Sequence, residues 1–264
     1  MTDPVLNAPS QTVNRRIGGD LAGFEWLVSV RDLGELEMTA SFAVDILDFK
    51  EPSAGPLAPV SSSIWHQAAK IVHQMKPTVR LSAALGERGE MLQTVGEVPS
   101  TFSFAKVGPS GCRCTQDLES LWSHARERLP SSVELVAVAY ADHESAGCVS
   151  PQIVFQTARA FGIRKCLVDT YEKNGQSTWD ILGSECLVEL GNTATDGALW
   201  WAMAGSIKLQ SVHDLTRQGI RPNCFGVRGD VCGDGRTGDL CTRRLAAWSR
   251  CLAGLDRKTG SPEA

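Results

Sequence analysis

Eight short runs rich in β-branched, aromatic and other apolar residues recur along the chain, and each ends in a polar or glycine-containing turn. The runs cover residues 24–30, 44–50, 78–85, 101–107, 134–142, 165–173, 199–207 and 223–230. Segments of helical length lie between or after most of them, at residues 62–74, 115–128, 151–161, 177–190, 210–218 and 241–255. Alternating strands and helices indicate a parallel sheet, and eight such units predict a closed (β/α)8 TIM barrel.

The competing fold is an open, doubly wound sheet. No strand is followed at once by a Gly-x-Gly-x-x-Gly or phosphate-loop motif, so that fold lacks its nucleotide-binding anchor. We expect a shortened third unit, because residues 86–100 contain glycines and a proline that leave room only for a short or irregular helix. No break in composition divides the chain. This predicts one catalytic domain at 21–257, between flexible extensions at 1–20 and 258–264.

The composition of the chain limits the binding partners and the cellular compartment that we expect for the protein. A net charge of −4 and the lack of any Lys/Arg-rich block argue against nucleic acid or anionic lipid as a partner. No stretch approaches 18 apolar residues and no signal peptide is visible, so we expect a cytoplasmic protein that makes no membrane contact. The nine cysteines are scattered and odd in number, which favours free thiols over disulfides or a metal site. No cofactor is indicated, and a homo-oligomer is left open.

Lysine is scarce, and its placement is informative. The chain has 8 lysines against 18 arginines. Half of these lysines fall at or just after the carboxyl ends of predicted strands: Lys50, Lys106, Lys173 and Lys208. Arginine cannot replace them chemically, because its guanidinium stays protonated, whereas a crowded or desolvated lysine amine can lose its proton and attack a carbonyl. The pattern predicts imine chemistry at the barrel mouth.

Carboxylates accompany two of these lysines. Residues two apart on a strand share a face, so Asp48 and Lys50 both point into the barrel, and Asp169 and Lys173 have the same even spacing. Asp45 has the opposite parity and no role in this pattern. Layers of structural salt bridges inside the barrel are the alternative explanation. Imine-forming aldolase chemistry needs one amine as nucleophile, with a second amine and carboxylates to move protons.

Glycine-containing loops predict a phosphate site. The seventh run ends in Ala-Gly-Ser-Ile, with Gly205 and Ser206, and the eighth ends in Gly-Val-Arg-Gly-Asp, with Arg228 and Gly229. The loops after strands 7 and 8 of such barrels commonly bind phosphate through backbone N–H groups. Asp142, at the end of the fifth run, is a further candidate for substrate binding. The expected substrate is a small phosphorylated carbonyl compound.

Several motifs, in order, resemble those of the (5-formylfuran-3-yl)methyl phosphate synthase family, also called 4-(hydroxymethyl)-2-furancarboxaldehyde-phosphate synthases. The motifs are DILDFKEPSAGPL (45–57), FAKVGPSG (104–111), VAVAYADHESAGCVSP (136–151), VDTYEKNGQSTWDIL (168–182), AMAGSIK (202–208) and FGVRGDVCGDGR (225–236). The resemblance implies a TIM-barrel lyase that condenses two molecules of glyceraldehyde 3-phosphate, with loss of phosphate and water, for methanofuran-type coenzymes. It covers nearly the whole chain.

The resemblance also implies roles for individual residues. Lys50 falls on the Schiff-base lysine of the family and Lys106 on its general base, while Asp48, Asp169 and Lys173 match supporting catalytic positions. The chain departs from the family pattern in the shortened unit at 86–100 and the extended loop at 233–241. Two alternatives remain at this point: a class I aldolase acting on another small sugar phosphate, and a non-catalytic barrel that binds a phosphorylated metabolite.

Overall fold

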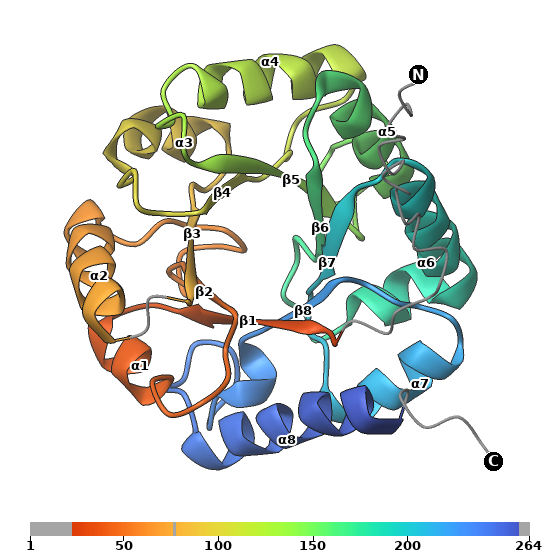
Figure 1. The fold of residues 1–264 in the computed structure, drawn as a ribbon. Coiled ribbons are helices and arrows are strands. Elements are labelled where there is room, and N and C mark those ends of the chain that lie inside the picture. The colour runs from red at the N-terminus through yellow and green to blue at the C-terminus, as the bar shows by residue number, and fades with distance from the viewer. Residues whose placement is uncertain (1–22, 76–77, 259–264) are drawn as a thin grey trace, which may run out of the picture.

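A computed structural model describes residues 23–75 and 78–258, which form a closed barrel of eight parallel strands inside a ring of helices (Figure 1). Each strand pairs with the next along the chain, and β1 closes the circle by pairing with β8. The predicted (β/α)8 barrel is therefore confirmed. The segments expected to be terminal extensions lie outside the described residues, apart from Lys258, which ends the last helix.

The strands are shorter than the apolar runs that predicted them, since the polar ends of those runs belong to loops. Their bounds are β1 Glu25–Val30, β2 Ile46–Phe49, β3 Arg80–Ala84, β4 Phe104–Val107, β5 Glu134–Tyr140, β6 Lys165–Asp169, β7 Trp200–Met203 and β8 Cys224–Val227. Of the four lysines placed near strand ends, only Lys106 lies within a strand. Lys50 directly follows β2, while Lys173 and Lys208 lie further out, in the loops after β6 and β7.

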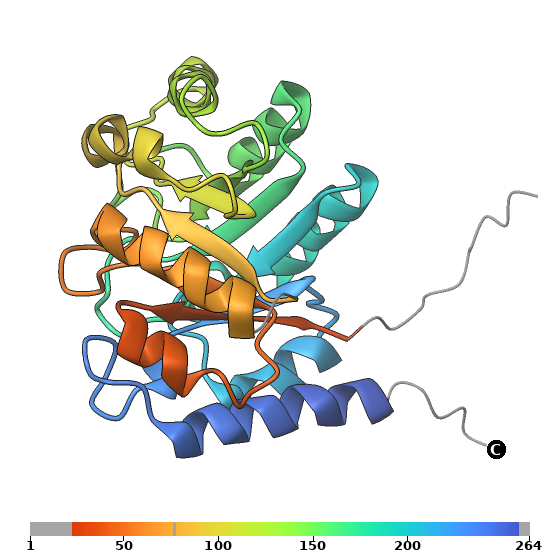
Figure 2. The same ribbon diagram turned by 60° about the vertical axis from the view of Figure 1, so that its left-hand side comes forward.

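A helix follows every strand. The α-helices are α1 Leu33–Met38, α2 Ser62–Met75, α3 Arg88–Thr94, α4 Thr115–Arg126, α5 Pro151–Phe161, α6 Thr178–Asp196, α7 Val212–Arg217 and α8 Thr242–Lys258. In the third unit, α3 has seven residues and continues into a 3-10 turn at Val95–Glu97. In both views α8 runs along one side of the barrel, between α1 and α7 (Figure 2). Within the described residues, no helix combines the length and apolar character that a bilayer crossing requires.

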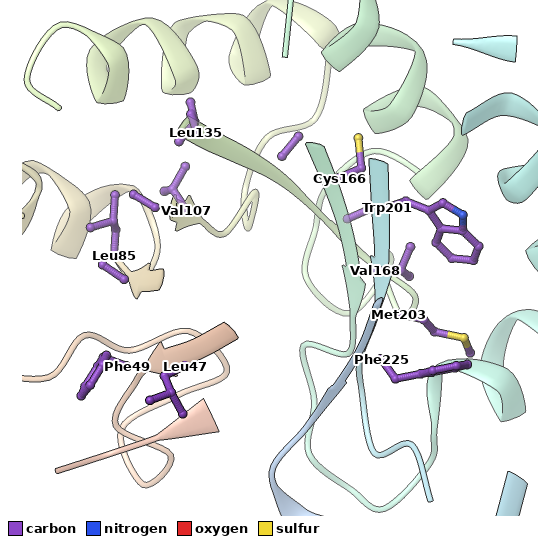
Figure 3. Packing of buried hydrophobic residues seen from close by; sticks show 14 of the residues in the cluster. Leu47, Phe49, Leu85, Val107, Leu135, Cys166, Val168, Trp201, Met203 and Phe225 are labelled. Atoms are coloured by element: carbon purple, nitrogen blue, oxygen red, sulfur yellow. The ribbon is translucent and has the colours of Figure 1, made fainter. Parts of the chain in front are cut away.

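Alternation along the strands separates two cores. Side chains such as Leu47 and Phe49 of β2 and Met203 of β7 point outward from the strands and pack beneath the helices (Figure 3). The neighbouring positions point inward and form a second cluster that includes Leu27, Ile46 and Leu167. The inward set becomes polar toward the carboxyl ends of the strands, and this places charged side chains at one end of the barrel.

An aromatic pair closes the opposite end of the barrel. The rings of Phe104 and Trp200 stack with their centroids 6.4 Å apart. The Lys165 ammonium lies 5.3 Å from the centroid of Phe104 and 5.2 Å from that of Trp200, a cation–π arrangement. Trp201, next in the chain, packs outward in the helix-facing core. These side chains therefore cover the amino-terminal end of the barrel interior, opposite the carboxyl-terminal mouth.

Asp45, whose charge had no role in the sequence pattern, ties together the amino-terminal ends of three strands. Its carboxylate accepts a hydrogen bond from the Trp26 backbone N–H at 2.7 Å. Its own N–H donates to the Trp26 carbonyl, and its carbonyl accepts from the Arg80 N–H, both at 3.0 Å. The side chain thus extends the β1–β2 pairing by one contact where the regular ladder begins.

We predict that Asp45→Ala lowers the free energy of unfolding by about 1 to 3 kcal/mol, because it removes the charged acceptor of a part-buried backbone N–H. Asp45→Asn keeps an acceptor oxygen and is expected to lose less than half as much. Urea unfolding followed by circular dichroism measures both values. Equal losses in the two variants would contradict the assignment.

Candidate active site

A pocket opens at the carboxyl ends of the strands, and its walls carry most of the charged residues that the sequence placed there. Its lining contains Leu27, Ser29, Lys50, Lys106, Leu167, Asp169, Lys173, Ala204, Gly205, Ser206, Ile207, Gly226, Val227, Arg228, Gly229 and Arg236. Lys208, the fourth lysine of the predicted cluster, is exposed and does not line the pocket. The mouth therefore presents three lysine amines rather than four.

Lys106 and Asp48 form a buried ion pair across the barrel interior. Lys106 Nζ lies 2.9 Å from Asp48 Oδ1, and the two residues are 3% and 0% exposed. The other carboxylate oxygen of Asp48 accepts a hydrogen bond from Ser29 Oγ at 3.1 Å. The lysine reaches into the pocket from β4, whereas Asp48 lies behind it on β2. Asp48 therefore acts on the pocket through Lys106.

Lys50 is almost as buried as Lys106 but has weaker partners. Its Nζ donates to the Pro56 carbonyl at 3.4 Å and lies 3.9 Å from Asp169 Oδ2. Burial lowers the pKa of Lys50 to about 8; Asp169 acts to raise this pKa, while the nearby Lys173 ammonium acts to lower it. At pH 7 about a tenth of this amine is therefore unprotonated, far more than for an ordinary lysine, and the unprotonated form is the one that attacks carbonyl groups.

Asp169 holds the second pair of charges together. Its Oδ1 accepts a hydrogen bond from Lys173 Nζ at 2.8 Å, and it also accepts the Thr170 backbone N–H at 2.7 Å. Burial acts to raise the pKa of Asp169, but the Lys173 and Lys50 ammonium groups outweigh it and lower the pKa to about 2. Lys173 also donates to the carbonyl and hydroxyl oxygens of Thr170, which fix it over the end of β6. Asp169 is therefore a permanent anion between two amines.

The loop after β7 turns its backbone toward the pocket. Gly205 and Ser206 both have positive φ, 82° and 54°. A Cβ atom at Gly205 would lie 2.3 Å from Thr178 Oγ1, so only glycine fits there. Within the described residues, the backbone N–H groups of Gly205, Ser206 and Ile207 have no protein acceptor. These unpaired donors at the pocket wall match what an anionic group needs.

Arg228 differs from its predicted role. Its side chain bonds Glu35 through both terminal nitrogens, at 2.7 and 2.9 Å, and its remaining N–H groups donate to the carbonyls of Ser29, Arg236 and Gly238. All five N–H donors of the guanidinium are thus used within the protein. None remains for a phosphate. The side chain instead fastens the loop after β8 to α1 and β1.

Asp142 also serves a loop rather than the pocket. Its two carboxylate oxygens accept the backbone N–H groups of Tyr171 and Glu172, each at 2.7 Å. It is absent from the pocket lining. The residue predicted to bind substrate therefore shapes the β6–α6 loop that carries Lys173, and its effect on the site is indirect.

Arg236 is the charged lining residue that the sequence patterns did not single out. It lies in the 233–241 loop after β8, and one of its terminal nitrogens donates to the Gly55 carbonyl at 3.0 Å. The signal available in the sequence was an arginine among glycines, in GDGRTGD, which is also the composition of an ordinary surface turn. In the described residues, no group of three or more His, Cys, Asp or Glu side chains is placed to hold a metal ion.

We predict that Arg228→Gln lowers the free energy of unfolding by up to about 3 to 5 kcal/mol, because it removes the closer of the two cations that pair with the buried Glu35 carboxylate and leaves only Arg31, at 3.4 Å. The double variant Arg228→Gln/Glu35→Gln also removes this weakly paired carboxylate and is expected to recover part of the loss. Chemical denaturation of both variants measures the difference. A double variant less stable than the single one would contradict the assignment.

Solved structures with a similar fold include phosphoribosylanthranilate isomerases and a CutC protein. Phosphoribosylanthranilate isomerase from Thermotoga maritima superposes with a TM-score of 0.56 at 12% identity, and covers 88% of this chain and 99% of its own. The CutC protein from Streptococcus agalactiae gives the same TM-score at 10% identity, over 77% of this chain and 98% of its own. At these identities the likeness shows the barrel fold and nothing about chemistry.

Curated relatives at higher identity share one name. The (5-formylfuran-3-yl)methyl phosphate synthases of Methanococcus maripaludis and Methanocaldococcus jannaschii are each 30% identical over 218 residues, which is 79% of this chain and 90% of theirs. The sequence model of the 4-HFC-P synthase family matches residues 26–249, from the first strand of the barrel into its last helix. By this match and by its curated relatives, the chain belongs to the 4-HFC-P synthase family of enzymes.

Proposed function

We propose that this enzyme condenses two molecules of glyceraldehyde 3-phosphate into 4-(hydroxymethyl)-2-furancarboxaldehyde phosphate through an imine on Lys50. The observation that carries the proposal is the environment of Lys50, a buried amine with a pKa of about 8. Lys106, which is paired with Asp48, lines the same pocket. The names of the relatives support the product. The proposed biological role is the supply of the furan unit of methanofuran-type coenzymes.

In the first step, the unprotonated Lys50 amine attacks the aldehyde carbon of one triose, and water leaves to give the imine. Removal of a proton from the adjacent carbon converts the imine into an enamine, which makes that carbon nucleophilic. Asp169 remains ionised throughout, because its pKa is about 2, and so stabilises the positive charge of the iminium. Lys173, held by Asp169 and Thr170, lies beside the same group.

The second lysine is suited to proton transfer. Lys106 enters the same pocket, and its partner Asp48 lies 2.9 Å away, so a proton can move through this pair without leaving an unpaired charge in the barrel. The enamine carbon attacks the aldehyde of the second triose and forms the carbon–carbon bond. Ring closure and elimination release one phosphate and two water molecules, which balances the atoms of two trioses against the furan product. Hydrolysis of the imine frees Lys50.

The phosphorylated substrate fits the polarity of the pocket. The β7-loop residues whose backbone N–H groups lack a protein acceptor line the same pocket as the lysines, and Gly229 of the β8 loop brings a second stretch of backbone to its wall. Backbone donors of this kind bind phosphate without adding another amine that could react with the aldehyde.

We predict that Lys50→Arg keeps the positive charge but abolishes imine formation, because a guanidinium does not lose its proton. The wild-type protein is incubated with glyceraldehyde 3-phosphate, reduced with borohydride, digested and analysed by mass spectrometry, while furan formation is followed by ultraviolet absorbance. A triose adduct on Lys50 together with the furan chromophore is expected. Lys70→Arg, on α2, is the matched control and should retain both signals.

The same experiment separates the rival activities. An adduct on Lys50 without the furan would indicate a class I aldolase acting on another sugar phosphate. A folded wild-type protein that forms no adduct would leave only metabolite binding. Appreciable furan formation by the Lys50→Arg variant would refute the imine assignment.

We further predict that the initial rate of adduct formation rises about tenfold for each pH unit below the pKa of Lys50 and levels off above about pH 8. The sign follows from the nucleophile: the reactive amine is the deprotonated form, whose fraction increases with pH until titration is complete. Imine formation is run briefly at each pH and reduced at one common pH, so that the reductant does not impose its own profile.

Lys173→Met tests the cause of this pKa. Its cation lowers the pKa of Lys50, and its loss also leaves Asp169 with only Lys50 as a strong partner, so the midpoint of the profile is expected to move to higher pH. An unchanged or lower midpoint would contradict the electrostatic account. Circular dichroism across the pH range confirms that each variant stays folded.

A further inference from the structure

The 233–241 loop is fastened to the barrel at several points, although it is rich in glycine. Cys232 and Leu240 form an antiparallel bridge, and the Gly233 N–H donates to the Asp239 carbonyl at 2.9 Å. The Arg228 side chain bonds the carbonyls of Arg236 and Gly238, at 2.7 and 3.2 Å. The backbone that carries Arg236 is therefore held in one position relative to the pocket.

The side chain of Arg236 is directed to the mouth of the pocket. It lines the same space as Lys50, Lys173 and the β7 loop, and its contact with the Gly55 carbonyl places its guanidinium across from the loop after β2. Burial lowers the pKa of Arg236, while the carboxylate of Asp169 acts in the opposite direction, so the group lies within the field of the catalytic charges. Its remaining N–H groups have no partner among the described residues.

A half-buried guanidinium with free donors is a suitable partner for an oxyanion. Its planar, forked N–H groups match two oxygens of a phosphate at once, and it cannot form an imine with the aldehyde. We infer that Arg236 binds the phosphoryl group of the triose and makes the pocket selective for phosphorylated aldehydes, an inference that rests on the function proposed above. Arg228 supports this residue by holding its backbone and does not touch the substrate.

The selectivity is tested by comparing two aldehydes. Adduct formation on Lys50, trapped with borohydride, is measured against the concentration of glyceraldehyde 3-phosphate and of unphosphorylated glyceraldehyde. Arg236→Gln is expected to raise the half-saturating concentration of the phosphorylated triose about 10- to 100-fold, the usual cost of losing a charge-assisted hydrogen bond. For glyceraldehyde the change should stay within about twofold, and Arg236→Lys should restore part of the loss.

Arg243→Gln is the matched control. Arg243 is exposed at the start of α8, next to the same loop, and does not line the pocket, so this variant removes one positive charge without removing the proposed contact. It should behave as the wild type with both aldehydes. Equal losses for the two aldehydes in Arg236→Gln, or no loss for the phosphorylated one, would overturn the inference.

Calorimetric titration with inorganic phosphate keeps this inference separate from the proposed reaction. Wild type and Arg243→Gln are expected to bind phosphate, and Arg236→Gln to bind it at least about tenfold more weakly. If the wild type forms no imine or furan but this difference in affinity is found, the proposed reaction fails and the anion site stands. Equal phosphate affinity in Arg236→Gln and Arg243→Gln, or no phosphate binding by the wild type, overturns the anion site.

Discussion

The site depends on an imbalance of buried charge. Three lysine amines share the mouth of the barrel with two carboxylates, so one amine has no counterion of its own. Lys106 and Lys173 lie 2.9 and 2.8 Å from their aspartates, whereas Lys50 lies 3.9 Å from an aspartate already bound to Lys173. A buried ammonium group is costly unless a counterion pairs with it. Lys50 lacks a close counterion, so the cost of desolvation lowers its pKa. On the proposed mechanism, this arrangement selects which of three chemically identical amines acts as the nucleophile.

The barrel makes this imbalance stable. Parallel strands bring their carboxyl ends to one edge, and their alternation puts Asp48, Lys106 and Asp169 on the inward face of three different strands. The outward face of the same strands packs against the helices in a continuous apolar layer, and the Phe104–Trp200 stack closes the other end. Much of the stability of the fold therefore comes from regions that do not touch the pocket, and the pocket can hold an amine that is poorly paired.

The parts that followed from the sequence are those governed by periodicity. Strand alternation gave the inward direction of Asp48 and Lys50, and the barrel symmetry brought Lys106 beside them, because both rules act over a few residues and are insensitive to loops. The failures lie in the loops. Lys208 follows β7 but is exposed to solvent. Asp142 accepts two backbone N–H groups, and Arg228 bonds the Glu35 carboxylate and three backbone carbonyls; no spacing rule describes these contacts. The position of Arg236 depends on contacts from Arg228, eight residues earlier, and on the Cys232–Leu240 bridge, so a local pattern could not reveal it.

The proposed reaction gives a chemical reason for arginine and backbone N–H groups, rather than further lysines, around the pocket. An aldehyde reacts with any unprotonated lysine that it meets, so every extra lysine near the substrate would be a competing site for imine formation. A phosphate close to Lys50 would also raise the pKa of that amine and reduce its reactivity, by the same electrostatic rule that makes Asp169 raise it. On the assignment proposed above, the guanidinium of Arg236 neutralises part of the phosphate charge and cannot itself deprotonate or form an imine. On that assignment, the substrate brings its anionic group into the pocket with less increase in the pKa of Lys50.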